Sequence, residues 1–524
     1  MKAFLHIGTP KTGTTTLQQF LDTNREQLLK HGILYPETFG LNSMGLVLGC
    51  YENGKRDGLS KLYNIESDKD VENLRKKLVG NLSTEVRKYN NLNSTIFSSE
   101  YFQLNLHTNA EIELLKSSLN EIGFDQIYIV VYLREQADLA NSFYSTSVKA
   151  GETAEQPSSP VDNRYRHLCD HRGTLERFGK TFGKSNIIVN IFEKGGIKNN
   201  SIIDDFMHII DSNLNPASLS VPMNKNEALS TEGTLVLSRL NSYFPRWVNG
   251  SLNPLRRFVI DFAEEHYANG KYTMPEELYK EYRTSFKSGN DWIRANYFPD
   301  KITLFKEKEK AQHSPECSAE DISDSDIEKY AHSILEKSTL FSMDNPGDRI
   351  HVGQGISYYH LGQYDKACDY FDLALTNTPD NSDALRYKAL SLLESGTFQE
   401  AAQYFQRLLK IDKTDHVSWL NKAQCLMNLN EYGQAEQTLL DGRKNCPDCY
   451  ALFSEYADLP KLTEDWNTAS DRWINTCSNF NDQLNPLYNA GTCLKMALRH
   501  EETCLLYTSP SPRDATLSRM PSSA

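Results

Sequence analysis

The chain has 524 residues, of which 39% are hydrophobic and 24% charged, and its formal net charge is −13. This length is enough for two to four domains, and the composition is typical of a soluble globular protein. The negative charge argues against a general nucleic-acid-binding protein, because phosphate contacts require a basic surface.

The sequence carries no signal that directs the chain into or across a membrane. No run of about 18 or more apolar residues occurs, so no transmembrane helix is expected. The N-terminus lacks the long apolar core of a signal peptide, and its first residues instead have the pattern of a strand. The ten cysteines are scattered, which suits reduced thiols. These features predict a cytoplasmic protein.

The first elements in chain order have the layout of a phosphate-binding loop. An apolar run at residues 1–7 leads into a polar loop, which is followed by a helical pattern. Backbone N–H groups at such a helix N-terminus can hold an anion. The spacing of Gly8 and Gly13 fits the G-x-x-x-x-G of a nucleotide-triphosphate loop, but Thr14 stands where that loop needs lysine, and Lys11 lies three residues before it. The loop is therefore predicted to hold a phosphate while a different group is transferred.

Further strands and helices alternate along the first 306 residues. Apolar segments predict strands at 127–133 and 186–192, and residues 94–98 are a shorter strand candidate. The segment 127–133 is continuously apolar, which is typical of a strand buried on both faces of a parallel sheet. Helical patterns occur at 111–122 and 163–182. The alternation predicts an α/β domain over residues 1–306, with a P-loop-like parallel sheet sandwiched by helices.

A second group of polar residues follows the strand at 127–133. Arg134 lies at its carboxyl end, where open α/β sheets bind ligands, and Ser142 comes eight residues later. A guanidinium can hold a phosphate through two hydrogen bonds. A serine one or two helical turns further on can add a hydroxyl donor. The chain thus offers a second phosphate-binding point.

Together the two segments resemble the motifs of sulfotransferases that use 3′-phosphoadenosine 5′-phosphosulfate. The segment 10–15 is similar to their 5′-phosphosulfate loop, and the segment 133–144 is similar to their 3′-phosphate site, with the same spacing of eight. The resemblance covers about residues 1–305. It implies that Lys11 stabilises charge on the bridging oxygen as it leaves. It also implies that the donor is held by Pro10, Lys11, Thr12, Gly13, Thr14, Thr15, Arg134 and Ser142.

The same resemblance implies a general base and no metal. Sulfotransferases commonly use a His or Glu after a neighbouring strand, and Glu100 occupies that place, with His107 and His6 as alternatives. Sulfuryl transfer depends on positioning and charge stabilisation and, unlike a kinase reaction, needs no magnesium. The chain lacks the family's late Arg-Lys-Gly-rich loop, which leaves the adenine contacts unassigned. The expected acceptor is a hydroxyl on a glycan, a lipid-linked molecule or a small molecule.

The C-terminal part begins after an acidic, serine-rich segment and contains an internal repeat. Residues 307–346 are predicted to be a linker that ends in one helix. Beyond it, four series of residues recur every 34 positions in one register. The series are Gly362, Gly396 and Asn430; Tyr364, Phe398, Tyr432 and Trp466; Ala367, Ala401, Ala435 and Ala469; and Phe371, Phe405, Leu439 and Trp473.

This period and pattern resemble the tetratricopeptide repeat. Small alanines let two helices approach closely, and the aromatic residues fill the space between successive hairpins. The resemblance predicts an all-α solenoid over residues 347–505, with about four repeats and a truncated fifth, which binds a protein partner or a substrate. Residues 506–524 resemble translated adaptor or vector sequence and are predicted to be a disordered, non-native tail.

Two other interpretations remain open. The first domain could be a P-loop nucleotide kinase or hydrolase, which would require a lysine after Gly13 and an aspartate that holds magnesium. Alternatively, the first domain could be inactive, so that the repeats act as a scaffold. Lys11, Arg134 and Ser142 argue against such loss of activity.

Overall fold

The computed structural model describes two compact units. The residues it leaves out are 212–213, 215, 217–218, 222–227, 249, 269, 307–316, 345–347, 481–484, 501 and 504–524. One unit comprises Met1–Ser242 and Arg257–Ala331, and the other comprises Tyr243–Arg256 and His332–Ala524. The predicted tail at 506–524 lies outside the described residues, as do parts of the predicted linker. The rest of that linker contains helix α16, Asp324–Asp344.

A five-stranded parallel sheet forms the centre of the N-terminal unit. Its strands lie in the order β2-β3-β1-β4-β5, and every neighbouring pair is parallel. The carboxyl ends of β3, β1 and β4 therefore meet at one edge of the sheet. The strands are β1 Lys2–His6, β2 Ile33–Leu34, β3 Ser94–Ser98, β4 Gln126–Leu133 and β5 Ile187–Ile191.

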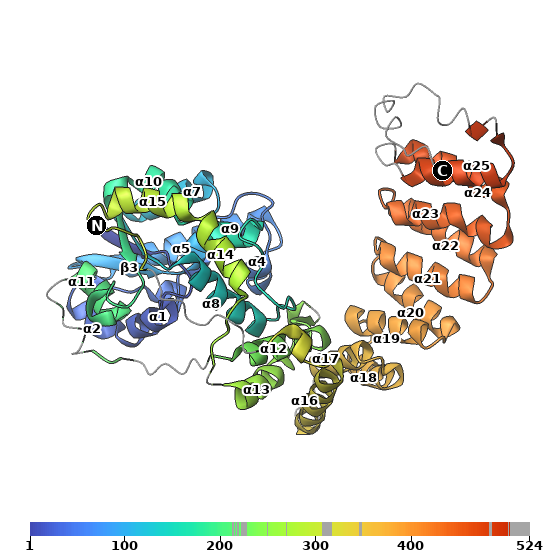
Figure 1. The fold of residues 1–524 in the computed structure, drawn as a ribbon, viewed down its shortest axis with the longest axis horizontal. Coiled ribbons are helices and arrows are strands. Elements are labelled where there is room, and N and C mark those ends of the chain that lie inside the picture. The colour runs from blue at the N-terminus through green and yellow to red at the C-terminus, as the bar shows by residue number, and fades with distance from the viewer. Residues whose placement is uncertain are drawn as a thin grey trace. The chain divides into compact units, whose positions relative to one another are not determined.

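Helices cover both faces of this sheet (Figure 1). Leu5 of β1 belongs to a core with α5, α7 and α10, whereas its neighbour Phe4 belongs to a core with α1 and α11. This alternation follows from the two-residue period of a strand. The helices are α1 Thr14–Thr23, α2 Arg25–Lys30, α3 Met44–Leu48, α4 Gly58–Leu62, α5 Asp68–Arg87, α6 Tyr101–Asn105, α7 Asn109–Ile122, α8 Gln136–Lys149, α9 Asn163–Cys169, α10 His171–Phe182, α11 Ile202–Ile210, α12 Thr231–Tyr243, α13 Arg256–Tyr267, α14 Glu276–Ser285 and α15 Lys287–Tyr297.

The predicted parallel sheet amid helices is confirmed, with two differences in detail. The single helix predicted at 163–182 is wrong, because the chain breaks at Asp170 into α9 and α10. The Asp170 carboxylate accepts a hydrogen bond of 2.8 Å from the N–H of Gly173 and caps α10. An aspartate side chain that binds the backbone locally competes with helix continuation. Strand β2 has only two residues, too few for a recognisable sequence pattern.

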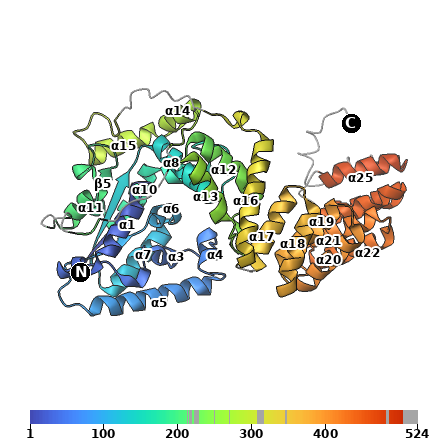
Figure 2. The same cartoon turned by 90° about the horizontal axis from the view of Figure 1, so that it is seen from below.

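The C-terminal unit contains the short antiparallel pair β6 Trp247–Val248 and β7 Ser251–Leu252, followed by a stack of helices. Figure 2 shows the helices from α17 onward lying side by side. The helices are α17 Asp348–His360, α18 Tyr364–Asn377, α19 Ser382–Glu394, α20 Phe398–Ile411, α21 His416–Asn428, α22 Tyr432–Asn445, α23 Tyr450–Asp458, α24 Trp466–Asn479 and α25 Asn485–Met496.

Each series of the 34-residue repeat has a structural role in this stack. The aromatic series supplies the first residue of α18, α20, α22 and α24. The alanine series and the series that contains Phe371 and Trp473 are fully buried. Gly396 and Asn430 take positive φ angles of 82° and 60° between two helices, a conformation that glycine and asparagine adopt most readily. The repeat predicted from the sequence is thus the repeat of helix pairs in the structure.

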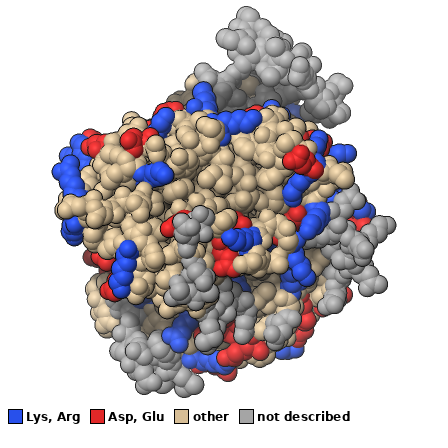
Figure 3. Space-filling view, turned by 90° about the vertical axis from the view of Figure 1, so that its left-hand side faces the viewer, with Lys and Arg blue, Asp and Glu red and all other residues tan. Residues whose placement is uncertain are grey.

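One face of the molecule illustrates the distribution of charge (Figure 3). Among the described residues on that face, Lys and Arg side chains are interspersed with Asp and Glu side chains, and uncharged residues separate them. This face therefore carries no continuous basic surface of the kind that nucleic-acid backbones require.

Candidate functional site

The loop that follows β1 is fastened to β4 by backbone hydrogen bonds. Thr9 N–H donates to the carbonyl of Tyr132 at 3.0 Å, and Tyr132 N–H donates to the carbonyl of Gly8 at 2.8 Å. The Thr9 hydroxyl also donates to the Tyr132 carbonyl, at 2.9 Å. These bonds hold the start of the loop at the carboxyl edge of the sheet, where the segments after β3 and β4 also begin.

Two glycines let the loop approach its neighbours. Gly8 has a φ of +99°, and a Cβ added to it would lie 3.2 Å from the Cα of Glu100. Gly13 has a φ of +83° and precedes α1 as its N-cap, and within the described structure no side chain caps this helix. The first-turn N–H groups of α1 therefore lack a capping acceptor, and the positive end of the helix dipole lies at the loop.

A cavity of about 350 Å³ opens beside this loop. Thr14, at the start of α1, is only 4% exposed, and its Oγ1 has no hydrogen-bond partner among the described residues. A buried hydroxyl without a partner is costly and is usually satisfied by a ligand or by water. The residues that line the cavity are Pro10, Lys11, Gly13, Thr14, Thr15, Thr16, Glu100, Tyr101, Leu104, Phe143 and Thr146.

The structure brings Lys11 and Arg134 together although they are 123 positions apart in the sequence. The Nη1 of Arg134 donates a hydrogen bond of 2.8 Å to the backbone carbonyl of Lys11. Burial lowers the pKa of Lys11 from its ordinary value, and the positive charges of Arg134 and Lys149 lower it further, while Glu100 opposes them. A bound anion would offset the lowering of the Lys11 pKa by burial and repulsion, because it favours the charged form of the lysine.

Glu100 lies in the same cavity, two residues after the end of β3. Its Oε2 accepts a hydrogen bond of 3.1 Å from the side-chain amide of Gln18 in α1, which also contacts the Ser98 carbonyl at 3.4 Å. The amide orients the carboxylate and leaves its other oxygen outside this contact. A carboxylate and an ammonium group therefore line one cavity.

Three of the predicted binding residues, Thr12, Arg134 and Ser142, are not among the described residues that line the cavity, and Arg134 contacts the loop through the Lys11 carbonyl instead. The Thr12 hydroxyl donates to the carbonyl of Thr9 at 2.6 Å, so this hydroxyl stabilises the loop itself. Ser142 is half-buried on α8 and is not among the described residues that line the cavity. Phe143 and Thr146, three residues apart on the same helix, line it instead. Their spacing of three residues predicts that they share one face of α8. The sequence of α8 alone does not show which face of the helix is turned to the loop.

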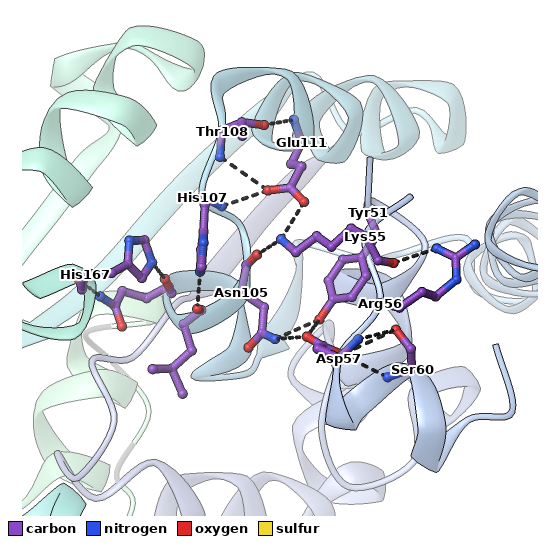
Figure 4. Close-up of polar contacts among 12 residues, drawn as sticks. Tyr51, Lys55, Arg56, Asp57, Ser60, Asn105, His107, Thr108, Glu111 and His167 are labelled. Carbon is purple, nitrogen blue, oxygen red and sulfur yellow. Dashed lines mark hydrogen bonds and ion pairs between the residues drawn. The ribbon is translucent and has the colours of Figure 1, made fainter. Parts of the chain in front are cut away.

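The two histidines considered as alternative bases have other contacts. His6 is fully buried, with its Nδ1 2.8 Å from the hydroxyl of Ser98. His107 Nε2 lies 2.7 Å from the carbonyl of Leu104 (Figure 4). Neither histidine is among the described residues that line the cavity.

No group of three or more His, Cys, Asp or Glu residues that could hold a metal ion occurs among the described residues. In that described part, no helix has both the length and the apolar character needed to span a bilayer.

Comparisons with known proteins match the helical repeats. The family described as anaphase-promoting complex, cyclosome, subunit 3 matches residues 360–442. Mouse tetratricopeptide repeat protein 14 is 23% identical over 142 residues, which cover 26% of this chain and 18% of that protein. The chain thus spans less than a fifth of the length of this curated relative.

Two solved structures are similar to about a third of this chain. MamA from Desulfovibrio magneticus RS-1 is 14% identical with a TM-score of 0.27, over 30% of this chain and 94% of that chain. A tetratricopeptide repeat protein from Parabacteroides merdae is 15% identical with a TM-score of 0.29, over 37% and 79% of the two chains. The family match and the observed helix pairs agree that the C-terminal region consists of tetratricopeptide repeats.

Proposed function

We propose that the N-terminal unit is a sulfotransferase with a P-loop-like sheet. It transfers a sulfuryl group from 3′-phosphoadenosine 5′-phosphosulfate to an acceptor hydroxyl, on a carbohydrate, a lipid-linked molecule or a small molecule. One observation carries the proposal: the loop with Lys11 and the start of α1 lies at the same sheet edge as Arg134, joined to it by a hydrogen bond of 2.8 Å.

The groups around the loop fit the 5′-phosphosulfate of this donor. The uncapped N-terminus of α1 presents backbone N–H groups, and the partnerless Thr14 hydroxyl can donate to a phosphate oxygen. Lys11 adds a positive charge in a buried setting, where electrostatic stabilisation is strong. Thr14 also stands where a kinase-type loop would hold its lysine, which favours sulfuryl transfer over phosphoryl transfer.

Arg134 fits the 3′-phosphate that distinguishes this donor from AMP and ATP. Its guanidinium donates one N–H to the Lys11 carbonyl, and its remaining N–H donors suit an oxyanion. In this proposal Ser142 adds its hydroxyl from the same helix as the lining residue Phe143.

The donor, when bound, supplies a sulfuryl group attached through an anhydride oxygen. Lys11 stabilises the negative charge that develops on that oxygen, and Glu100 accepts the proton of the acceptor hydroxyl. Tyr101, Leu104 and Phe143 form the less polar part of the cavity and would contact the acceptor.

The repeat array would bind a protein partner or a carrier of the acceptor. Tetratricopeptide stacks present extended surfaces to other chains. No disulfide joins the cysteines in the described part of the chain, and reduced thiols are typical of the cytoplasmic location proposed for the protein.

Isothermal titration calorimetry on the full chain tests the donor site. We expect 3′,5′-bisphosphoadenosine to bind at least about 100-fold more tightly than AMP, since a charge-assisted bidentate contact contributes about 3 kcal/mol. Lys11→Ala should abolish transfer from labelled donor and leave the far-UV circular dichroism unchanged. Equal affinities for the two nucleotides would remove the 3′-phosphate site, and retained turnover would remove the role of Lys11.

A further inference from the structure

The junction between α9 and α10 carries two histidines that reach two different parts of the site. Nε2 of His167 lies 2.8 Å from the carbonyl of Gln103, and Nε2 of His171 lies 2.7 Å from the carbonyl of Arg134. A carbonyl oxygen can only accept, so both histidines carry the hydrogen on Nε2. The break at Asp170 lies between them, and His167 contacts helix α6 whereas His171 contacts the residue after β4.

The first of these bonds holds the flank that bears Glu100. Helix α6 begins directly after Glu100, has five residues and contributes Tyr101 and Leu104 to the cavity wall. The last carbonyls of a helix have no partner within it. In α6 they are satisfied by side chains from outside the helix (Figure 4). The carbonyls of Gln103, Leu104 and Asn105 accept from His167, His107 and Lys55, respectively.

This arrangement around α6 is itself braced. Lys55 forms a salt bridge of 2.6 Å with Glu111, whose side chain is fully buried. The amide of Asn105 donates to the Asp57 carboxylate at 2.8 Å, and the amide of Gln103 donates to the carbonyl of His167 at 3.3 Å. A single-turn helix gains little stability from its own hydrogen bonds, so these contacts determine where Glu100 and its neighbours lie.

The second bond holds the flank that bears Arg134. His171 is 1% exposed, and its Nδ1 has no partner in the described structure. Burial lowers the pKa of His171 to about 4, so the ring is neutral at physiological pH and its one N–H is committed to the Arg134 carbonyl. The residue therefore acts on the backbone at the end of β4 and not on a ligand.

The charged surroundings differ between the two histidines. The groups that act on His167 include His107, Arg177 and Asp170. The rings of His107 and His167 lie 3.8 Å apart, and burial together with this neighbour lowers the pKa of His167 to about 4. The ionisable group that acts on His171 is Asp170.

We propose that His167 and His171 are positioning residues that fix the Glu100 flank and the Arg134 flank of the anion site against each other. The proposal rests on the proposed function, since it gives those two flanks their roles. It predicts that each histidine affects one flank. His171 affects the affinity for the nucleotide through the position of Arg134. His167 affects the order of α6 and has little effect on the affinity for the nucleotide.

The test compares leucine and glutamine variants of each histidine in the full chain. A glutamine side-chain amide can still donate to the carbonyl, whereas leucine cannot. We expect His171→Leu to weaken 3′,5′-bisphosphoadenosine binding about tenfold or more, because small displacements of a positioned group are costly, and His171→Gln to restore most of it. His167→Leu should leave that affinity within about twofold. His266→Leu is the matched control, because its ring contacts the Phe262 carbonyl of its own helix at 2.9 Å.

Amide hydrogen exchange without ligand separates this proposal from the proposed function. His171→Leu should raise exchange at residues 134–138, and His167→Leu should raise it at residues 101–105, with β1 unchanged in both. If the wild-type chain fails to distinguish 3′,5′-bisphosphoadenosine from AMP, the sulfotransferase assignment falls while these exchange data still decide the positioning roles. Unchanged exchange in the leucine variants, or glutamine variants that behave like them, would overturn the proposal.

Discussion

Mild acid should destabilise the N-terminal unit, because burial holds several of its histidines in the neutral form, His6 and His171 most completely. His6 lies inside β1, and His171 lies at the start of α10, both at most 1% exposed. Within the described structure each ring has one nitrogen without a partner, Nε2 in His6 and Nδ1 in His171. Burial lowers the pKa of His6 to about 3 and that of His171 to about 4, from an ordinary value of 6.5.

The sign and size of the effect follow from proton linkage. Above pH 6.5 neither the folded nor the unfolded state binds these protons, so the full stability is present. Below pH 6.5 the unfolded state binds them and the folded state does not, so stability falls until the pH reaches the folded pKa of each group. One pKa unit corresponds to about 1.4 kcal/mol, so each histidine costs about 2 kcal/mol at pH 5, or about 4 kcal/mol together.

Urea unfolding read by pulse proteolysis measures this loss for the N-terminal unit separately, because cleavage within the β1–β5 region is identified by mass. The midpoint should fall between pH 7 and pH 5. In His171→Gln the loss between these two values should be about 2 kcal/mol smaller than in the wild-type chain, since glutamine does not titrate. Other titrating groups cancel in this comparison.

Two results would refute the reasoning. If the wild-type chain and His171→Gln lose the same stability between pH 7 and pH 5, the histidine is not held neutral by burial. If the stability of the wild-type unit rises on acidification, the folded state binds the protons and the assigned direction is reversed.

Three further substitutions test other parts of the molecule. Thr14→Val should weaken the binding of 3′,5′-bisphosphoadenosine about tenfold, as expected for the loss of one hydrogen bond to a charged group. The urea midpoint should not fall, because Oγ1 of Thr14 has no protein partner in the described structure. A lower midpoint with normal affinity would contradict this. Glu100→Gln should lower turnover about 100-fold and leave nucleotide affinity within about twofold; a near-normal rate would assign the base elsewhere. Trp473→Ala should destabilise the array by about 3–5 kcal/mol in urea, since the ring is fully buried, and nucleotide affinity should not change.

The sequence alone was sufficient for features that depend on local periodicity. The apolar run at 127–133 appears as β4, because a strand buried on both faces needs no polar alternation, and the shorter candidate at 94–98 appears as β3. The 34-residue series located the helix pairs of the array. Each repeat contacts only its neighbours, so the residues that make these contacts recur at the same spacing in the sequence. The glycine-bounded loop before α1 was also predictable, because the glycine spacing and the helical pattern that follows it are local.

Contacts between distant segments were decided only by the tertiary structure. The strand order put Arg134 against the Lys11 carbonyl, and no local pattern joins residues 123 positions apart. The turn of α8 brought Phe143 and Thr146 to the cavity in place of Ser142, and the Thr12 hydroxyl was taken up by its own loop. The histidines beside Asp170 acquired their carbonyl partners through the break between α9 and α10. Local patterns reflect hydrogen bonding and burial within one element. A site depends on how several elements pack together, and the sequence of any single element does not determine that packing.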